Sequence, residues 1–361
     1  NTVVGDEAGT AITTGDNNTA VGFQAAVGNT TGSSNTAIGH NTLISNTTTS
    51  NNTAVGRSAL QNSTADNNTA VGYQAGYSNT TGTGNQSLGT QAAYTLTTGN
   101  ANTAMGWQAL QLSTTSSDNS AFGAFALQSN TTGASNVGIG REALQANTTA
   151  SNNTAVGKSA LLANTTGYAN TSVGLSSMGA NTTGGYNSAF GYEALASNTT
   201  ASYNNAIGWQ ALYYNTTGYQ NTASGYHALF ANTTGYLNTA VGAHSLENNT
   251  TGTLNSAFGR YALNANTTGY QNTALGEGAG YNNTTGNQSI WIGRAATSTS
   301  VTASGQCTLG GTYITNLRCN DTTISSLSDS RDKTDVIDSP YGLDFINTVR
   351  PVQFKWESRD G

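Results

Sequence analysis

Cysteine, proline and charge are all scarce in this 361-residue chain, and each shortage excludes a class of protein. Two cysteines do not make a disulfide framework or a zinc site. Charged residues make up only 8% of the chain and the net charge is −6, so the clustered lysine and arginine of a nucleic-acid-binding shaft are absent. No apolar run reaches the length of about eighteen residues that a membrane span needs, so none is expected.

Glycine is abundant, with 44 residues, and many of these recur at a fixed spacing. The step is seventeen residues, except for one step of sixteen from Gly56 to Gly72. A fixed period of this length is typical of a solenoid, in which each repeat forms one turn of a stacked coil. The chain is therefore expected to form a long rod, with one coil for each member of the series Gly5, Gly22, Gly39, Gly56, Gly72, Gly89, Gly106, Gly123, Gly140, Gly157, Gly174, Gly191, Gly208, Gly225, Gly242, Gly259, Gly276 and Gly293.

Each repeat carries three features: an apolar residue just before the glycine, an Ala-Leu pair three and four residues after it, and an Asn-Thr-Thr-Gly corner. Ser224 is the polar exception at the first position. The apolar stretches are too short for an amphipathic helix, so we expect two short strands per coil, each sending apolar side chains inward. The sequence therefore predicts an all-β fold, a parallel β-solenoid or β-roll of 17-residue coils.

Stacking of identical coils has two further consequences. Asn and Thr at equivalent positions are expected to form ladders of side-chain hydrogen bonds. The short coil after Gly56 is expected to lose its residue in the polar corner, where strand register is unaffected. The core of one coil is thin, so several chains are expected to associate along the shaft, for instance through the leucine row.

Composition changes near the C-terminus and divides the chain into three parts. We expect a repeat shaft over 1–294, a transitional β segment over 295–327, and a separate segment over 328–361. The last segment holds both prolines and twelve of the 28 charged residues, which are 11 Lys and Arg and 17 Asp and Glu. Cys307 and Cys319 lie in the transitional segment, either as free thiols or in a disulfide.

The repeated Asn-Thr-Ala-Val-Gly-x-x-Ala, found at 18–25, 52–59, 68–75 and 153–160, resembles the head repeat of trimeric autotransporter adhesins. The similarity covers roughly residues 1–296. It implies a left-handed parallel β-roll with three chains side by side, hence a homotrimer. The coil here is longer than the adhesin coil, which implies an additional corner.

The motif Ser328-Asp329-Ser330-Arg331-Asp332-Lys333 and the stretch 342–356 resemble the start of the endosialidase-type intramolecular chaperone domain of phage tail spikes and fibres. The resemblance implies trimerisation, a short helix ended by Pro351 followed by a strand, and self-cleavage between Leu327 and Ser328. Ser328 would be the nucleophile and Lys333 its base. Two alternatives stay open: a capped helix start without catalysis, or a domain that acts only as a trimer clamp. The chain covers only the beginning of such a domain.

Aromatic residues recur after the glycine or at the Asn-Thr-Thr-Gly corner, where exposed rings can stack on sugars. An alternative is that these rows pack between chains. The three histidines, His40, His227 and His244, are interpreted as occupying different coil positions, so neither a metal site nor a cofactor is expected. The candidate sugar-binding residues are Tyr73, Trp107, Tyr168, Trp209, Tyr219, Tyr226 and Tyr236.

These patterns together favour a structural protein: the distal shaft of a phage tail fibre or spike in the virion, which attaches to a host receptor. The chain begins within a repeat, so an N-terminal part that joins it to other tail proteins is expected to be missing. Alternatives are a bacterial trimeric surface adhesin and an ice-binding solenoid, although adjacent corner threonines point to opposite faces. An enzyme acting on polysaccharide would need paired carboxylates drawn from Glu142, Glu193, Glu247 and Glu277.

Overall fold

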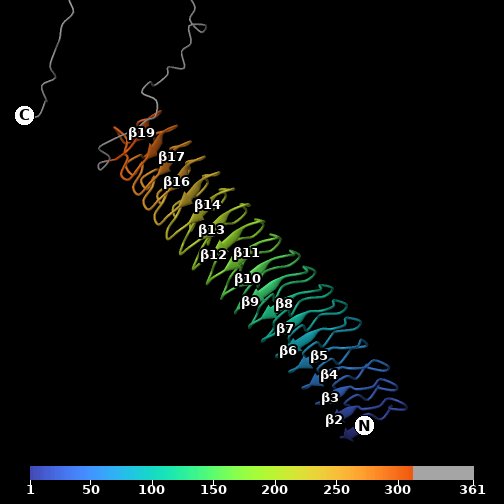
Figure 1. Ribbon diagram of the computed structural model, residues 1–361. Helices are drawn as coiled ribbons and strands as arrows, with labels where there is room; N and C mark the ends of the chain where they lie inside the picture. The colour runs from blue at the N-terminus through green and yellow to red at the C-terminus, as the bar shows by residue number, and fades with distance from the viewer. Residues whose placement is uncertain (312–361) are drawn as a thin grey trace, which may run out of the picture. The chain divides into compact units, whose positions relative to one another are not determined.

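The computed structural model describes residues 1–311 of the chain. In Figure 1, this part is an elongated stack of coils, with one strand arrow in each coil. The strands are β1 (Thr2–Val4), β2 (Thr19–Val21), β3 (Thr36–Ile38), β4 (Thr53–Val55), β5 (Thr69–Val71), β6 (Gln86–Leu88), β7 (Thr103–Met105), β8 (Ser120–Phe122), β9 (Val137–Ile139), β10 (Thr154–Val156), β11 (Thr171–Val173), β12 (Ser188–Phe190), β13 (Asn205–Ile207), β14 (Thr222–Ser224), β15 (Thr239–Val241), β16 (Ser256–Phe258), β17 (Thr273–Leu275), β18 (Ile290–Ile292) and β19 (Cys307–Leu309).

All nineteen strands belong to one parallel sheet, in which each strand pairs with the next strand along the chain. Equivalent positions of neighbouring coils lie opposite each other, as in the pair Thr154 and Thr171. The predicted all-β solenoid of 17-residue coils is therefore confirmed. Pairing continues to β19, which lies in the segment expected to be transitional β. The helix and strand expected after residue 341 lie outside the described residues.

The expectation of two strands per coil is wrong, because each described coil contains one strand of three residues. The reason is the backbone after the glycine. In the coil that begins at Gly208, Gln210 and Leu212 have φ angles of 52° and 54°, in the left-handed region, so no extended segment can form there. A leucine rarely adopts this angle. Here Leu212 N–H donates to the Ala228 carbonyl of the next coil at 3.0 Å, which holds the turn in place.

The orientation of the apolar residue before each glycine also differs from the expectation. Successive strand side chains point to opposite faces, and the middle residue is the one that faces the core. In β13, Ala206 is fully buried, whereas Ile207 is 43% exposed. A single inward position per strand, filled by alanine in most coils, allows the sheet to lie close to the opposite wall.

The leucine row faces the interior, so the proposal that it joins neighbouring chains is wrong. Leu195, Leu212 and Leu229 are all fully buried within one chain. They fill the space between the sheet and the opposite turns, together with the alanine that precedes each of them. Any contact between copies must therefore use other side chains.

Close stacking at the glycine series explains why this residue recurs. Gly208 has a φ of +128°, and a Cβ atom there would lie 2.6 Å from the Gly225 carbonyl oxygen. The same close approach and positive φ recur at its equivalents in neighbouring coils, such as Gly191 and Gly225. Glycine is required for both the angle and the spacing.

The expected asparagine ladders are confirmed, and they are buried. We define the corner Asn ladder as the asparagines seven residues after the glycine, from Asn130 to Asn283. From Asn147 onward, each Nδ2 donates to Oδ1 of the preceding coil at 2.8–3.1 Å. A second ladder lies just before the strands, where Oδ1 of Asn153 accepts from the Asn170 backbone N–H at 3.0 Å. Threonines form a third, as in the bond from Thr148 Oγ1 to the Thr165 carbonyl.

The short coil keeps the sheet in register, as predicted. Thr53 of β4 pairs with Thr69 of β5, sixteen residues later. The missing residue comes from the polar corner, where buried Ser63 stands in place of the ladder asparagine. A second local variation occurs in β18, where Trp291 takes the inward position. Gly280 lies where other coils have leucine, and this leaves room for the indole.

Candidate functional site

An apolar stripe runs along the outer face of the whole described sheet. We define the sheet stripe as the last residue of each strand, just before the glycine. Ile207 and Phe190 are typical members, at 43% and 41% exposure. Its exposed large members are Val4, Ile38, Val71, Met105, Phe122, Ile139, Phe190, Ile207, Val241, Phe258, Leu275, Ile292 and Leu309.

The first residue of each strand shares this outer face with the sheet stripe. It is threonine in most strands, as at Thr154, Thr171 and Thr222. Rows of threonine and of apolar side chains thus lie side by side on the sheet. The earlier objection to ice binding concerned the corner threonines, and it does not apply to this strand row. The size of the stripe residues varies from Ser224 to Phe258, so the surface is uneven.

One aromatic row follows the glycine series. We define the glycine-side row as the aromatic residues directly after these glycines: Phe23, Tyr73, Trp107, Tyr192, Trp209 and Tyr226. Trp209 lies between Tyr192 and Tyr226, with ring centroids 5.2 and 6.0 Å away and planes tilted by 53° and 60°. Trp107 and Trp209 are its most exposed rings, at 54% and 53%. Tilted and exposed rings offer flat faces to a ligand.

A hydrogen bond to Glu193 raises the pKa of Tyr192, and the negative charge of Glu193 adds to this effect. The Tyr192 hydroxyl therefore stays protonated at neutral pH, and its proton is donated to Glu193.

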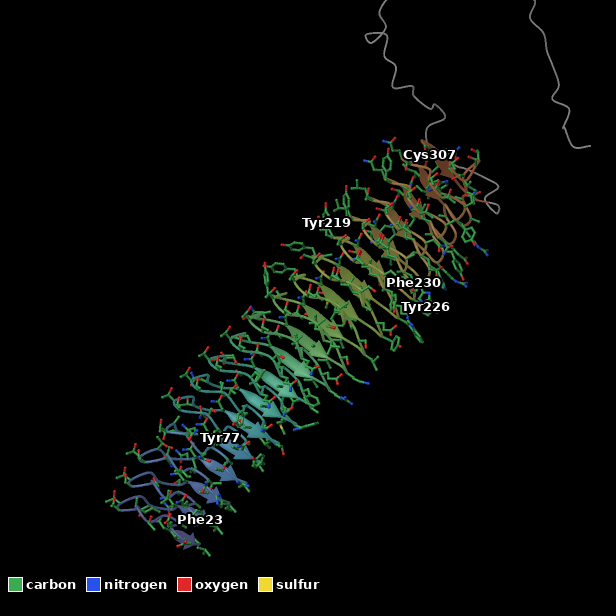
Figure 2. All side chains as sticks on the ribbon, turned by 180° about the vertical axis from the view of Figure 1, so that it is seen from behind. Phe23, Tyr77, Tyr219, Tyr226, Phe230 and Cys307 are labelled. Atoms are coloured by element: carbon green, nitrogen blue, oxygen red, sulfur yellow. The ribbon has the colours of Figure 1, made fainter. Side chains whose placement is uncertain are left out.

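A second aromatic row lies at the Asn-Thr-Thr-Gly corner. Its members are Tyr168, Tyr186, Tyr203, Tyr219, Tyr236 and Tyr270. Figure 2 places Tyr219 and Tyr226 on opposite edges of the solenoid, so the two rows form separate surfaces. Tyr219 and Tyr236 stack face to face with centroids 4.9 Å apart. Their faces are partly covered by each other, and Tyr236 is half-buried, which makes this row a weaker sugar platform than Trp209.

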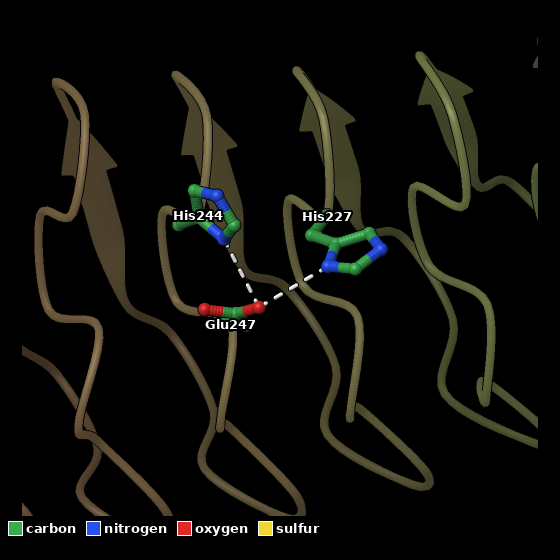
Figure 3. Close-up of side chains that lie close together, drawn as sticks. All are labelled: His227, His244 and Glu247. Carbon is green, nitrogen blue, oxygen red and sulfur yellow. Dashed lines mark hydrogen bonds and ion pairs between the residues drawn. The ribbon is translucent and has the colours of Figure 1, made fainter.

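The interpretation that the three histidines occupy different coil positions is wrong, because two of them share a position. His227 and His244 each lie two residues after a glycine of the series, in neighbouring coils that follow β14 and β15. Their Nδ1 atoms lie 3.2 and 3.0 Å from the same oxygen, Oε1 of Glu247 (Figure 3). His40 lies one residue after its glycine and stacks against Phe23. Counting from the glycine would have revealed the pair, although not the reach of Glu247.

The Glu247 carboxylate is held from both sides. Its Oε2 accepts a 2.9 Å hydrogen bond from Asn264 Nδ2. Burial acts to raise the pKa of Glu247, but contacts with His244, Asn264 and His227 outweigh it, so the pKa lies below its usual range. Glu247 is therefore ionised at neutral pH and supplies a negative charge to the cluster.

The other residues considered for catalysis are not brought together. Glu142, Glu193, Glu247 and Glu277 lie on coils that are at least two apart, or about 10 Å or more along the stack. Glu142 instead pairs with Arg141, its neighbour in sequence, at 2.9 Å. Ser328, Lys333 and the bond after Leu327 lie outside the described residues, as does Cys319. Cys307 is a free, exposed thiol.

No protein-family model matches the chain, and no curated protein matches it either. Within residues 1–311, no helix has the length and hydropathy needed to cross a bilayer. Any function assigned to this chain therefore has to be argued from the solenoid and its exposed surfaces.

Proposed function

We propose that this chain is the shaft of a surface-attachment fibre, specifically of a phage tail fibre or spike, in which three copies lie side by side. The sheet stripe is the observation that supports this proposal. A row of half-exposed apolar side chains continues along the whole described sheet, and contiguous exposed apolar surface of this kind marks protein–protein interaction sites. Copies of the same chain in register can cover such a stripe with an equally long partner.

The shape of the stripe favours a protein partner over ice. An ice lattice is uniform, whereas the stripe changes from Val173 to Phe190 to Ile207 in three successive coils. Uneven apolar surfaces can interlock with other side chains. The ice-binding alternative therefore fits less well, despite the threonine row beside the stripe.

The C-terminal motif favours the phage fibre over a bacterial adhesin, because the resemblance around Ser328 is to a phage chaperone domain. In this proposal the domain trimerises the fibre, and Ser328 and Lys333 cut the chain after Leu327. The fibre is carried by the virion and binds a receptor on the host surface.

The first prediction concerns the number of copies. In sedimentation velocity, the assembly is expected to have three times the mass of one copy, which is 36.8 kDa before any cleavage. With Cys307 and Cys319 replaced by serine, Ile207→Cys is expected to form disulfide-linked copies under mild oxidation, because the stripes of neighbouring copies meet.

Self-cleavage is tested by the intact mass of the unmodified protein. Cleavage would give a product that ends at Leu327.

Leu112→Cys is the matched control for this experiment. Leu112 is 45% exposed, similar to Ile207, but it lies outside the sheet stripe. It should remain uncrosslinked under the same conditions. A single-chain mass, or equal cross-linking at the two positions, would contradict the proposed assembly.

The second prediction concerns the receptor. In this proposal, Trp107 and Trp209 are the main sugar-binding residues of the glycine-side row, since their indoles are the most exposed. Trp209→Ala is expected to weaken binding to a bacterial surface oligosaccharide by about tenfold or more, in line with about 1.5 kcal/mol for one aromatic contact. Saturation-transfer NMR with purified oligosaccharides measures this, and Leu112→Ala serves as the control. If Trp209→Ala binds as well as the unmodified chain, the row has no such role.

A further inference from the structure

The orientation of His227 follows from a chain of hydrogen bonds across neighbouring coils. Gln210 Nε2 donates to Glu193 Oε2 at 2.7 Å, and a carboxylate can only accept. The other end of the Gln210 amide, Oε1, lies 2.9 Å from His227 Nε2. Nε2 must therefore carry the proton. In a neutral imidazole, Nδ1 then has a free lone pair, which is the state required of a metal ligand.

That lone pair faces a negatively charged oxygen. His227 Nδ1 and Glu247 Oε1 are 3.2 Å apart, and with a neutral ring neither atom has a proton to donate. His244 Nδ1 lies 3.0 Å from the same oxygen, but it is buried and has no aligned hydrogen-bond partner. Three possible ligand atoms thus converge on one point, and a cation among them would contact all three at once.

The cluster is compact enough to surround one ion, since the two imidazole centroids are 5.6 Å apart. One metal ion places a single charge centre between all three ligand atoms. The three donor atoms lie within 4.8 Å of one another. In a tetrahedral site with bonds of about 2.0–2.1 Å, donors lie about 3.3 Å apart, and the two nitrogen–oxygen distances of 3.2 and 3.0 Å are close to this value.

Neighbouring side chains hold the ligands in this arrangement. The His227 ring is stacked with Tyr226 and Phe230, whose centroids lie 4.1 and 4.3 Å away. The His244 ring stacks against Tyr261 at 4.9 Å. The contacts of Gln210 to His227 and of Asn264 to Glu247 form the outer hydrogen bonds that orient metal ligands in proteins.

We propose that His227, His244 and Glu247 bind a divalent transition-metal ion of the zinc class. Two imidazoles and one carboxylate suit zinc, whereas calcium and magnesium prefer all-oxygen sites. Three protein ligands leave a fourth position for water, and the ligands are partly exposed to solvent. Because His227 belongs to one coil and the other two to the next, the ion also ties two coils together.

Zinc titration of the full chain tests this site. The protein is prepared without a histidine tag, stripped with a chelator, and carries serine at Cys307 and Cys319 so that thiols do not compete. Isothermal titration calorimetry is expected to show one zinc ion per chain. His227→Gln and His244→Gln should each weaken binding by at least 100-fold. Glutamine occupies the same coil position at Gln210, so these variants are expected to fold.

Two further measurements make the result decisive. His40→Gln should leave zinc binding unchanged, since His40 lies outside the cluster. Cobalt in place of zinc should give visible absorption bands typical of four-coordinate nitrogen and oxygen ligands, and these should be lost with Glu247→Gln. The proposal is overturned if the unmodified chain binds no zinc, or if the variant carrying both histidine substitutions binds it equally well while its circular dichroism spectrum is unchanged.

Discussion

Replacing Gly276 with alanine is expected to disrupt the stacking of its coil on the next coil. Gly276 has a φ of +133°, and its added Cβ would lie 2.7 Å from the carbonyl carbon of Gly293 in the next coil. Both the unfavourable angle and the backbone contact oppose the native stacking, and backbone atoms cannot move aside as a flexible side chain can. We expect the free energy of local opening to fall by about 3 kcal/mol or more, which corresponds to amide exchange that is about 100-fold faster.

Gly278→Ala, two residues later in the same coil, is the matched control. Gly278 also has a positive φ, of +64°, but no atom lies within 4 Å of its added Cβ. The equivalent position in the next coil already carries Ala295, with a φ of 54°. The expected cost is about 1–2 kcal/mol, from the left-handed angle alone.

Hydrogen exchange measured by mass spectrometry on peptides from residues 259–293 compares the two variants. A repeat protein need not unfold in one step, so a local measurement is more informative than a melting temperature. Equal protection in Gly276→Ala and Gly278→Ala would show that the glycine series is not required for coil stacking.

The period, the parallel pairing and the existence of the side-chain ladders could all be predicted from the sequence, because they depend only on which residues recur. The burial of the asparagines could not. The direction of the side chains could not. Bulky Ile207 was taken as a core residue, whereas small Ala206 occupies the core. The strand lies so close to the opposite wall that leucine from the turn, such as Leu212, fills the remaining space. Hydrophobicity alone does not indicate which of two apolar rows fits a narrow interior.

The number of strands per coil could not be predicted from the sequence either. Glycine and asparagine are the residues that most readily adopt left-handed angles, but Leu212 and His227 adopt such angles as well. Their angles are held by hydrogen bonds from neighbouring coils, and these bonds exist only after stacking. Local preference could not reveal turns that tertiary contacts impose.

The histidine cluster is a variant of a polar ladder that runs two residues after the glycine series. Elsewhere in that ladder, Gln108 donates to Gln91 at 2.9 Å and Gln91 donates to Gln74 at 3.1 Å. An amide has both a donor and an acceptor, so it can pass this pattern from coil to coil. Where His227 and His244 meet the Glu247 carboxylate, this relay ends, because a carboxylate has no proton to donate. The metal proposal concerns this part of the row, where two histidines take the place of such amides.

Breaking the corner Asn ladder is expected to be nearly as costly as blocking the glycine position. Asn215 Nδ2 donates to Asn198 Oδ1 at 3.1 Å and to the Gly218 carbonyl at 2.8 Å, while its Oδ1 accepts from Asn232 at 2.8 Å. All three asparagines are fully buried, so lost partners cannot be replaced by water. At about 1–3 kcal/mol for each unsatisfied group, less the gain from burying leucine, Asn215→Leu should destabilise its coil by about 2–4 kcal/mol.

The chain itself contains the same replacement, which indicates that leucine fits. Leu96 occupies the ladder position and is buried, and Asn79 in the coil before it has an Oδ1 atom without a hydrogen-bond partner. Any loss of stability in Asn215→Leu therefore reflects missing hydrogen bonds more than a steric clash. Thr217→Ala, at an exposed position in the same corner, is the control. It should change the free energy of local opening, measured by amide exchange, by less than about 0.5 kcal/mol. If exchange in Asn215→Leu matches that of Thr217→Ala, buried asparagines set the geometry of the corner without adding to its stability.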